Sequence, residues 1–257
     1  MKRKVACLLL ALTGLMAQAS AFAKETIRIG VDATYPPFEY TKPDGTLAGF
    51  EIDLGNAMCE KVQAECIWVP MSFDGLIPAL KVKKIDAVFS SLGISEKRKK
   101  VVDFSDRTWT GFTSMLSLKR LKLQPTAESL KGKILGVQQG SIQEDFARQK
   151  LMPQGVSVQA YQTQEQVYAD LLNGRIDASM QDMTQAQTGF IEKAGHPEFA
   201  NQKVVDELLP ADSAIAIRKG DTRTMDLINR GIHAIHADGT YGKIQRQFFG
   251  DLDLYNK

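Results

Sequence analysis

Residues 76–91 read LIPALKVKKIDAVFSS, and residues 167–182 read VYADLLNGRIDASMQD. The two stretches share one layout: an amphipathic helix, a basic residue, the triplet IDA, a short strand and closing polar residues. A helix that connects two parallel strands forms a right-handed crossover unit. Two copies of this layout, far apart in the chain, predict an α/β protein organised in two lobes.

The rest of the chain continues the alternation of strands and helices. The strand patterns cover residues 26–32, 66–70, 85–91, 101–106, 110–118, 134–140, 156–162, 175–182 and 213–221. The helical patterns cover residues 52–62, 73–84, 141–150, 164–174, 183–195, 226–239 and 240–250. Residues 35–49 contain prolines and a PDG turn and predict irregular structure. The alternation predicts mostly parallel sheets flanked by helices.

The N-terminus has the pattern of a secretory signal peptide. Residues 2–4 are basic, residues 5–16 are apolar, and small residues follow that end in AFA. This arrangement predicts cleavage after Ala23 and a periplasmic mature protein. The apolar run is shorter than the roughly 20 residues of a membrane-spanning helix, and Cys7 lies too early for a lipoprotein cleavage site.

The charge of the mature chain excludes some classes of partner. Removing residues 1–23 from 257 leaves 234 residues, in which 29 Lys and Arg face 30 Asp and Glu, a net charge of −1. A nearly neutral chain gives no reason to expect nucleic acid or an anionic membrane surface as a partner. No later apolar run reaches spanning length, so we expect a soluble protein of one large domain or two lobes.

Cys59 and Cys66 are the two cysteines that follow the signal peptide. In an oxidising compartment this pair is expected to form a disulfide, which would contribute about 2–3 kcal/mol by closing a short loop. Two free buried thiols are the alternative. Two cysteines without a nearby histidine make a poor zinc site, and we expect no metal.

Polar residues follow predicted strands in both halves of the chain. Ser90 and Ser91 end one strand, Asp182 ends another, and the corner QQGSIQE at 138–144 follows a third. Ligands of open α/β sheets sit beyond the carboxyl ends of the strands. We therefore expect these residues at the mouths of the two lobes.

Together these residues predict a grip on a zwitterion. The guanidinium of Arg98 can bind a carboxylate through two parallel hydrogen bonds. Ser141 and Glu144 have capping-box spacing, and the amides of residues 141–143 attract an anion at a helix start. Asp182 could bind an ammonium group, so the set suits an α-amino acid. A surface arginine, an ordinary helix cap and a turn aspartate remain the alternative on spacing alone.

A second group of residues suits the side chain of such a ligand. Asp32 ends the first predicted strand, where its carboxylate could pair with a distal ammonium or guanidinium. Tyr35 and Phe73 could sandwich the ligand, with cation–π contributions of about 0.5–2 kcal/mol. Considered singly, each aromatic residue also suits a hydrophobic core.

These features lie in stretches that resemble the periplasmic solute-binding proteins of polar amino acid ABC importers, most of all the lysine/arginine/ornithine- and histidine-binding branch. The stretches are IRIGVDATYPPFEY (27–40), GFEIDLGNAMCEKVQAECIWV (49–69), FDGLIPALKVKKIDAVFSSLGISEKR (73–98), SLKGKILGVQQGSIQE (129–144), LLNGRIDASMQD (171–182) and HADGTYGKI (236–244). The resemblance implies a type II periplasmic binding protein, with two α/β lobes joined by two hinge strands. Lobe 1 would comprise residues 24–112 and 209–257, and lobe 2 residues 113–208.

The resemblance also implies the function and the residues that carry it. A cationic amino acid (Lys, Arg, ornithine or His) would bind between the lobes of a monomer, without a cofactor, for delivery to a membrane permease. Arg98 would bind its carboxylate and Asp182 its ammonium, and Cys59 and Cys66 match a disulfide of that branch. The ligand-binding positions are Asp32, Tyr35, Phe73, Ser90, Ser91, Gly93, Arg98, Gln138, Ser141, Ile142, Gln143 and Asp182.

Three positions depart from the pattern of that branch. Gly93 stands where a hydroxyl side chain usually faces the ligand ammonium. Loss of that hydroxyl would either weaken the grip on the ammonium or leave room for an N-substituted amino acid such as the opines octopine and nopaline. Gln138 replaces an apolar residue, and residues 207–217 (ELLPADSAIAI) replace a glycine-rich stretch. An acid at position 32 also occurs in glutamine binders, so glutamine and opines are the alternative ligands.

Two other classes of protein remain as weaker alternatives. Some proteins of this fold are dehydratases, which need a positioned acid and base. His196, His233 and His236 lie outside the expected site, and no nucleophile–base pair is apparent. A receptor's ligand-sensing domain is the other alternative, although no membrane segment follows the signal peptide.

Overall fold

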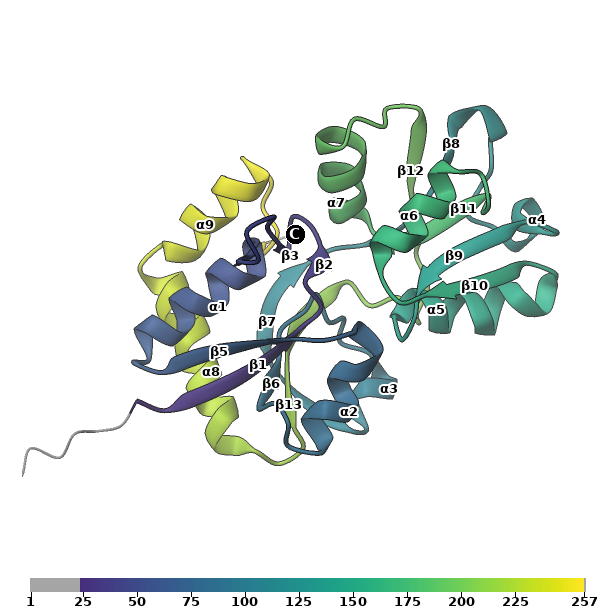
Figure 1. Cartoon of the computed structure of the whole chain (residues 1–257). Coiled ribbons are helices and arrows are strands. Elements are labelled where there is room, and N and C mark those ends of the chain that lie inside the picture. The colour runs from purple at the N-terminus through teal and green to yellow at the C-terminus, as the bar shows by residue number, and fades with distance from the viewer. Residues whose placement is uncertain (1–23, 257) are drawn as a thin grey trace, which may run out of the picture.

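The computed structural model describes residues 24–256, which form two lobes, each built on a five-stranded sheet with helices packed against it (Figure 1). The predicted signal peptide, residues 1–23, lies outside the described residues. Two connections join the lobes: residues 111–112, and residues 204–211. The backbone amide of Gly111 donates to the carbonyl of Ala211 at 2.8 Å, so the two connections run side by side.

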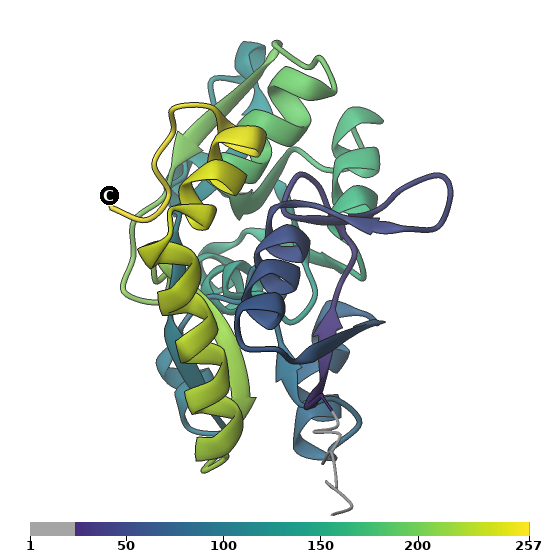
Figure 2. The ribbon, with the colours of Figure 1, turned by 90° about the vertical axis from the view of Figure 1, so that its left-hand side faces the viewer.

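The first sheet has the strand order β5-β1-β6-β13-β7. Its strands are β1 (Thr26–Val31), β5 (Glu65–Pro70), β6 (Ala87–Val88), β7 (Val102–Thr110) and β13 (Asp212–Arg218). The helices of this lobe are α1 (Phe50–Lys61), α2 (Leu76–Lys81), α3 (Glu96–Lys99), α8 (Thr222–Ala237) and α9 (Thr240–Phe249). Figure 2 shows α1 beside α8 and α9, with which it packs.

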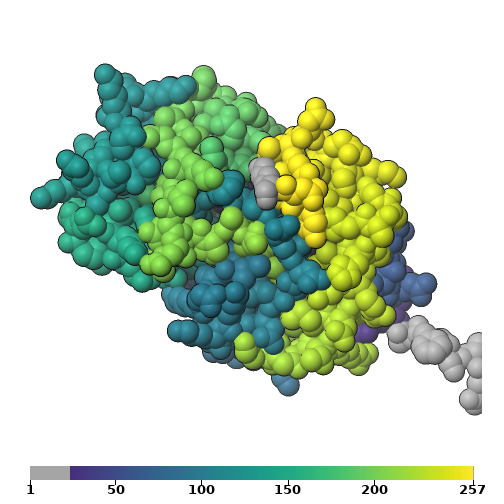
Figure 3. All heavy atoms as spheres, turned by 180° about the vertical axis from the view of Figure 1, so that it is seen from behind, coloured from purple at the N-terminus to yellow at the C-terminus, as the bar shows by residue number. Residues whose placement is uncertain are grey.

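The second sheet has the order β10-β9-β11-β8-β12. Its strands are β8 (Thr113–Leu118), β9 (Ile134–Gln138), β10 (Ser157–Tyr161), β11 (Ala178–Asp182) and β12 (Phe199–Lys203). Its helices are α4 (Ala127–Leu130), α5 (Ile142–Phe146), α6 (Gln164–Leu172) and α7 (Met183–Gln185). Wider π-helical turns, Ala147–Leu151 and Ala186–Lys193, extend α5 and α7. Seen from behind, this teal lobe and the yellow helix α9 lie on opposite sides (Figure 3).

The layout repeated in the sequence forms equivalent units in the two lobes. Helix α2 leads into β6, which pairs in parallel with β1, and α6 leads into β11, which pairs in parallel with β9. The α/β prediction is therefore confirmed. The sheets are mostly parallel, as predicted: four of the five strands in each share a direction, while β13 runs antiparallel to β6 and β7, and β8 runs antiparallel to β11 and β12. Strands β13 and β8 each follow one of the two connections between the lobes. Each enters its sheet without the crossover helix that a parallel strand needs.

Three local features differ from the prediction. Residues 35–49 are irregular only in part: the predicted PDG turn is present at 43–45, but β2 (Thr34–Tyr35), β3 (Glu39–Thr41) and β4 (Leu47–Ala48) form a small antiparallel sheet. Strand β12 was not predicted. The strand expected over 85–91 is shorter, since pairing ends at Val88 and the backbone turns at Ser91, where φ is 48°.

Aromatic packing supports the end of lobe 1 that faces the other lobe. Phe38 stacks on Trp109 at 4.6 Å between ring centroids and contacts Phe249 at 5.2 Å, and all three side chains are buried. Burial of such rings contributes a large share of core stability. At the same hydrophobic core, Cys59 of α1 is bonded to Cys66 of β5, which confirms the predicted disulfide.

Candidate ligand-binding site

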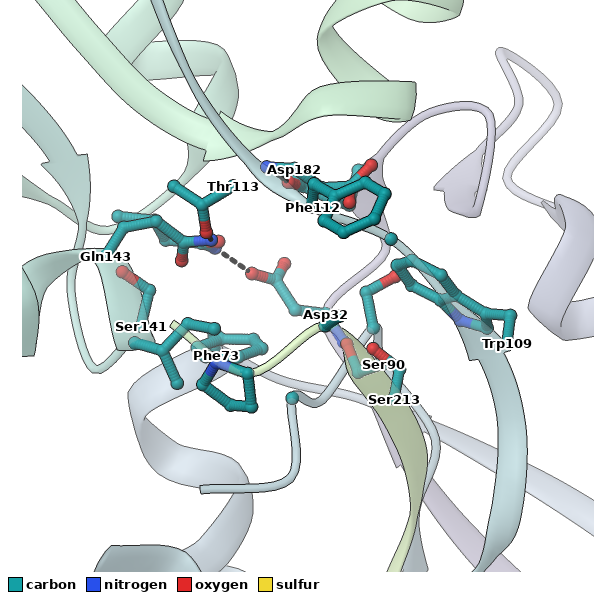
Figure 4. Close-up of a pocket in the computed structure, with 18 of the residues that line it drawn as sticks. Asp32, Phe73, Ser90, Trp109, Phe112, Thr113, Ser141, Gln143, Asp182 and Ser213 are labelled. Carbon is teal, nitrogen blue, oxygen red and sulfur yellow. Dashed lines mark hydrogen bonds between the residues drawn. The ribbon is translucent and has the colours of Figure 1, made fainter. Parts of the chain in front are cut away.

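A cavity of about 570 Å³, partly open to solvent, lies between the lobes (Figure 4). All twelve predicted ligand-binding residues line the cavity, although they come from positions 32 to 182 of the chain. The ends of β1, β6, β9 and β11 all open toward it, as expected for the carboxyl ends of parallel strands.

Arg98 is the buried cation of the cavity. Ser95 caps α3, and its side chain accepts from the Arg98 backbone amide. The guanidinium donates from Nη1 to the carbonyl of Gly93 at 2.8 Å and from Nη2 to the carbonyl of Gly140 at 3.1 Å. Within residues 24–256 it forms no ion pair, and burial lowers the pKa of Arg98 to about 10. Arg98 is therefore charged at neutral pH and retains donors for an anion.

The start of α5 faces Arg98 from lobe 2. Ser141 caps the helix, and its Oγ accepts from the amide of Glu144 at 3.0 Å. The Glu144 carboxylate reaches back to the amide of Gly140 at 2.7 Å, one residue earlier than a standard capping box. The Gln143 side chain is held by a 3.0 Å bond from its Nε2 to Thr113 Oγ1. The first-turn amides and Arg98 thus come from different lobes and meet in one cavity.

Asp182 lies at the junction of β11 and α7. Its Oδ1 caps α7 by accepting from the amide of Gln185 at 2.8 Å, and its own amide donates to the Tyr35 hydroxyl at 2.9 Å. Gly111 of the first connection packs directly beneath the carboxylate. A Cβ at Gly111 would lie 2.3 Å from Asp182 Oδ2, so a larger residue there would displace the acid.

Asp32 follows β1 of lobe 1 and is 3 % exposed. Its amide donates to Ser90 Oγ at 2.9 Å, and its Oδ1 accepts from Thr34 Oγ1 at 2.9 Å. Its Oδ2 accepts from Gln138 Nε2 of the other lobe at 2.6 Å, the dashed line in Figure 4. Burial raises the pKa of Asp32 to about 6, so the group is largely ionised at pH 7 and above.

The other predicted residues complete the walls. Phe73 lies under the guanidinium of Arg98, with 5.5 Å between its ring centroid and Cζ. Gly93 lies against Ile142, and a Cβ added to Gly93 would be 3.1 Å from Ile142 Cδ1. Glycine at this position therefore leaves little unused space in this closed arrangement.

Eight cavity residues were not predicted from the sequence. They are Glu39, Trp109, Gly111, Phe112, Thr113, Pro210, Ala211 and Ser213. Most lie at or beside the two connections between the lobes. Glu39 lies in β3, within the segment for which irregular structure was expected, and no feature of the sequence marks its acid as buried.

The charges that line the cavity do not balance. Asp32, Glu39 and Asp182 face it together with one cation, Arg98. A zwitterion that pairs with Arg98 and Asp182 would leave Asp32 without a cation, and Glu39, whose pKa burial holds well above its usual range, adds a carboxyl group that can ionise. The cavity therefore favours a ligand that carries an additional positive charge.

Direct contacts hold the lobes together around the cavity. Lys97 of lobe 1 pairs with Asp145 of lobe 2 at 2.7 Å, and Gln139 Nε2 donates to Asp74 Oδ2 at 2.8 Å. On the far side, Gln185 Nε2 donates to the Pro36 carbonyl at 3.0 Å. These contacts define a closed arrangement of the two lobes.

Residues 27–251 match the bacterial extracellular solute-binding proteins, family 3. The chain is a member of this family. The lysine/arginine/ornithine-binding periplasmic protein of Escherichia coli K12 is 42% identical over 260 residues, which cover 99% of each chain. The histidine-binding periplasmic protein of the same organism is 40% identical over 259 residues, with the same coverage. A solved ancestral arginine-binding protein with bound arginine is 34% identical, with a TM-score of 0.82 over 88% of this chain and 99% of the other.

Two further properties bear on this solute-binding protein's site. Across residues 24–256 no helix combines the length and apolar character needed to cross a membrane, and no three His, Cys, Asp or Glu side chains are grouped as metal ligands. His233 pairs with Asp106 at 2.7 Å, while His236 stacks between Tyr241 and Tyr255. None of these residues lines the cavity.

Proposed function

We propose that this protein is the substrate-binding component of an ABC importer and that it carries a cationic α-amino acid, arginine, lysine, ornithine or histidine. The observation that carries the proposal is the arrangement of charge in the cavity. Arg98 from one lobe and Asp182 from the other suit an amino acid head group, and the remaining acids, Asp32 and Glu39, suit a distal cation. Two relatives that match over 99% of the chain are named as binding proteins for such amino acids.

In this proposal each end of the ligand has its own set of contacts. Arg98 and the amides of 141–143 bind the α-carboxylate, and Asp182 binds the α-ammonium. The ligand side chain passes between the rings of Tyr35 and Phe73 toward Asp32 and Glu39. Ser90, Ser91, Gly93, Gln138, Ile142 and Gln143 complete the walls.

Ligand binding is coupled to closure because the two lobes supply complementary halves of the site. A ligand that contacts both lobes favours the closed arrangement, which the permease would recognise. We propose lobe boundaries at 24–112 with 209–257, and at 113–208, in accord with the strands that each sheet contains. We further propose that the protein acts as a monomer in the periplasm after cleavage at Ala23, and that it performs no catalytic step.

A thermal-shift panel tests the proposed function. The protein is unfolded, washed free of copurified ligand and refolded, and is then heated with arginine, lysine, ornithine, histidine, glutamine, octopine or nopaline. A ligand present at 100 times its Kd stabilises the native state by about 2.7 kcal/mol, which raises the Tm by several degrees. We expect this rise for one or more of the four cationic amino acids. A rise with glutamine or an opine alone would contradict the proposed ligand class.

A substitution of Asp32 separates the distal subsite from the head-group subsite. Asp32→Asn keeps the shape and the hydrogen-bond acceptor but removes the charge. We expect arginine affinity to fall by about 1.5–3 kcal/mol, roughly 10- to 150-fold, the range for a hydrogen bond to a charged group. The affinity for citrulline, the uncharged analogue of arginine, should fall much less. Equal losses for the two ligands in calorimetric titration would show that Asp32 does not bind the distal group.

A further inference from the structure

Two buried glutamates lie against each other at the wall of the cavity. Glu39 belongs to β3 and is 1 % exposed, and Glu51 belongs to the first turn of α1 and is 0 % exposed. The backbone brings them together, because the amide of Glu51 donates to the carbonyl of Phe38 at 2.9 Å. Glu39 lines the cavity, whereas Glu51 lies behind it.

Neutral groups supply the hydrogen bonds to both carboxyl groups. Glu51 accepts from the amide of Ser91 at 2.7 Å and from Trp109 Nε1 at 2.6 Å. Glu39 accepts from Ser91 Oγ at 3.1 Å and from Ser90 Oγ at 3.4 Å. Neither carboxyl group forms an ion pair within the described part of the chain, 24–256.

Two adjacent carboxylates in a buried site cannot both remain ionised without a compensating cation. Burial and mutual repulsion hold the pKa of Glu39 well above its usual range, and burial raises the pKa of Glu51 to about 7. The other titratable groups that face the pair do not offset this effect. Asp32 adds a further negative charge near Glu39. Tyr35 and Tyr241, the tyrosines close to the pair, are neutral near pH 7 because burial raises their pKa values.

We propose that Glu39 and Glu51 share a proton in the ligand-free protein and release it when a cationic ligand side chain binds beside Glu39. This inference rests on the proposed function, since it requires a cation at the distal end of the cavity. Glu51 then acts as a positioning residue: it holds Ser91 and Trp109 in the wall and lets Glu39 become a full anion only when a cation is present. The proton passes to solvent, and the carboxylate pair and the ligand cation share the remaining charge.

The direction of the pH dependence follows from this linkage. The bound cation lowers the pKa of the pair, so binding releases a proton, and affinity rises with pH through the interval between the bound and free pKa values. Release of one proton sets a limit of about tenfold in affinity per pH unit. At pH 7.5, Asp32 is already ionised in large part and adds little to the release.

Calorimetric titration with arginine at pH 7.5, in buffers of different ionisation enthalpy, measures the released proton directly. We expect close to one proton per bound arginine and almost none per bound citrulline. Glu39→Gln should abolish the release and reduce the preference for arginine over citrulline. Glu60→Gln, a change at an exposed position on helix α1, should leave the number of released protons and the preference for arginine unchanged.

A second measurement needs no ligand. The indole of Trp109 donates to Glu51, so its fluorescence reports on the charge of that carboxyl group. In the Trp68→Phe background, Trp109 is the chain's other tryptophan and provides the signal. We expect a fluorescence transition near pH 7 as Glu51 ionises, which Glu51→Gln should abolish.

The outcomes separate the two proposals. Arginine binding without proton release, or a flat fluorescence titration, would overturn the proton linkage and leave the proposed function intact. Failure of every cationic amino acid to bind would overturn the proposed function and the linkage together.

Discussion

Arg98→Ala is expected to lower arginine affinity by about 2–5 kcal/mol, roughly 30-fold to several thousand-fold, because the ligand carboxylate would lose its buried partner. Arg98 is 7 % exposed, so solvent screens the interaction little, and Asp145, the nearby carboxylate that acts on it, is itself paired with Lys97. The arginine affinity of Arg98→Lys should lie between those of the original protein and Arg98→Ala, since lysine restores the charge without the two-pronged geometry.

Agmatine, the analogue of arginine that lacks the carboxylate, makes the test specific. Its weak affinity should be nearly the same for the original protein and Arg98→Ala. Lys99→Ala removes an exposed cation from the same short helix and should leave arginine binding unchanged. Calorimetry or competition binding gives the affinities, and near-native arginine affinity in Arg98→Ala would rule out the role assigned to Arg98.

Asp182→Asn should have an effect of similar size, about 2–5 kcal/mol in arginine affinity, because it removes the acceptor charge for the ligand ammonium. Asparagine caps a helix about as well as aspartate, so the bond to the Gln185 amide is retained and the fold of α7 should persist. The free energy of unfolding without ligand should therefore change by less than about 1 kcal/mol.

The matched ligand for this variant is the arginine analogue without the α-amino group. A double-mutant cycle between the substitution and the missing amino group should show a coupling energy of at least about 1 kcal/mol. Asp251→Asn, at an exposed position near the C-terminus, is the control variant. Additive losses in the cycle would show that Asp182 and the ammonium do not interact.

Much of the site could be predicted because strand ends in α/β sheets have a known direction. Ser90, Ser91 and Asp182 each follow a strand of recognisable pattern, and Arg98 lies shortly after one of them. The family resemblance then related residues from separate halves of the chain. The structure brings them to one cavity, and their contacts with a ligand remain a proposal.

The residues that were missed depend on interactions without a local signal. Glu39 reaches the cavity because β2 and β3 pair, and strands of two or three residues are too short to show periodicity. Trp109 and Gly111 lie in an extended segment whose sequence does not indicate where it leaves one sheet for the other. The antiparallel pairs of β13 depend in the same way on how the chain returns to lobe 1.

The position of β13 between β6 and β7 affects the order in which the molecule can be completed. In chain order, the second sheet has all its strands by residue 203, whereas the first still lacks β13, residues 212–218. Pairing between such distant segments is slow to form. The lobe that comes first in the chain is therefore completed last, and the facing edges of β6 and β7 have no partner strand until residues 212–218 are in place.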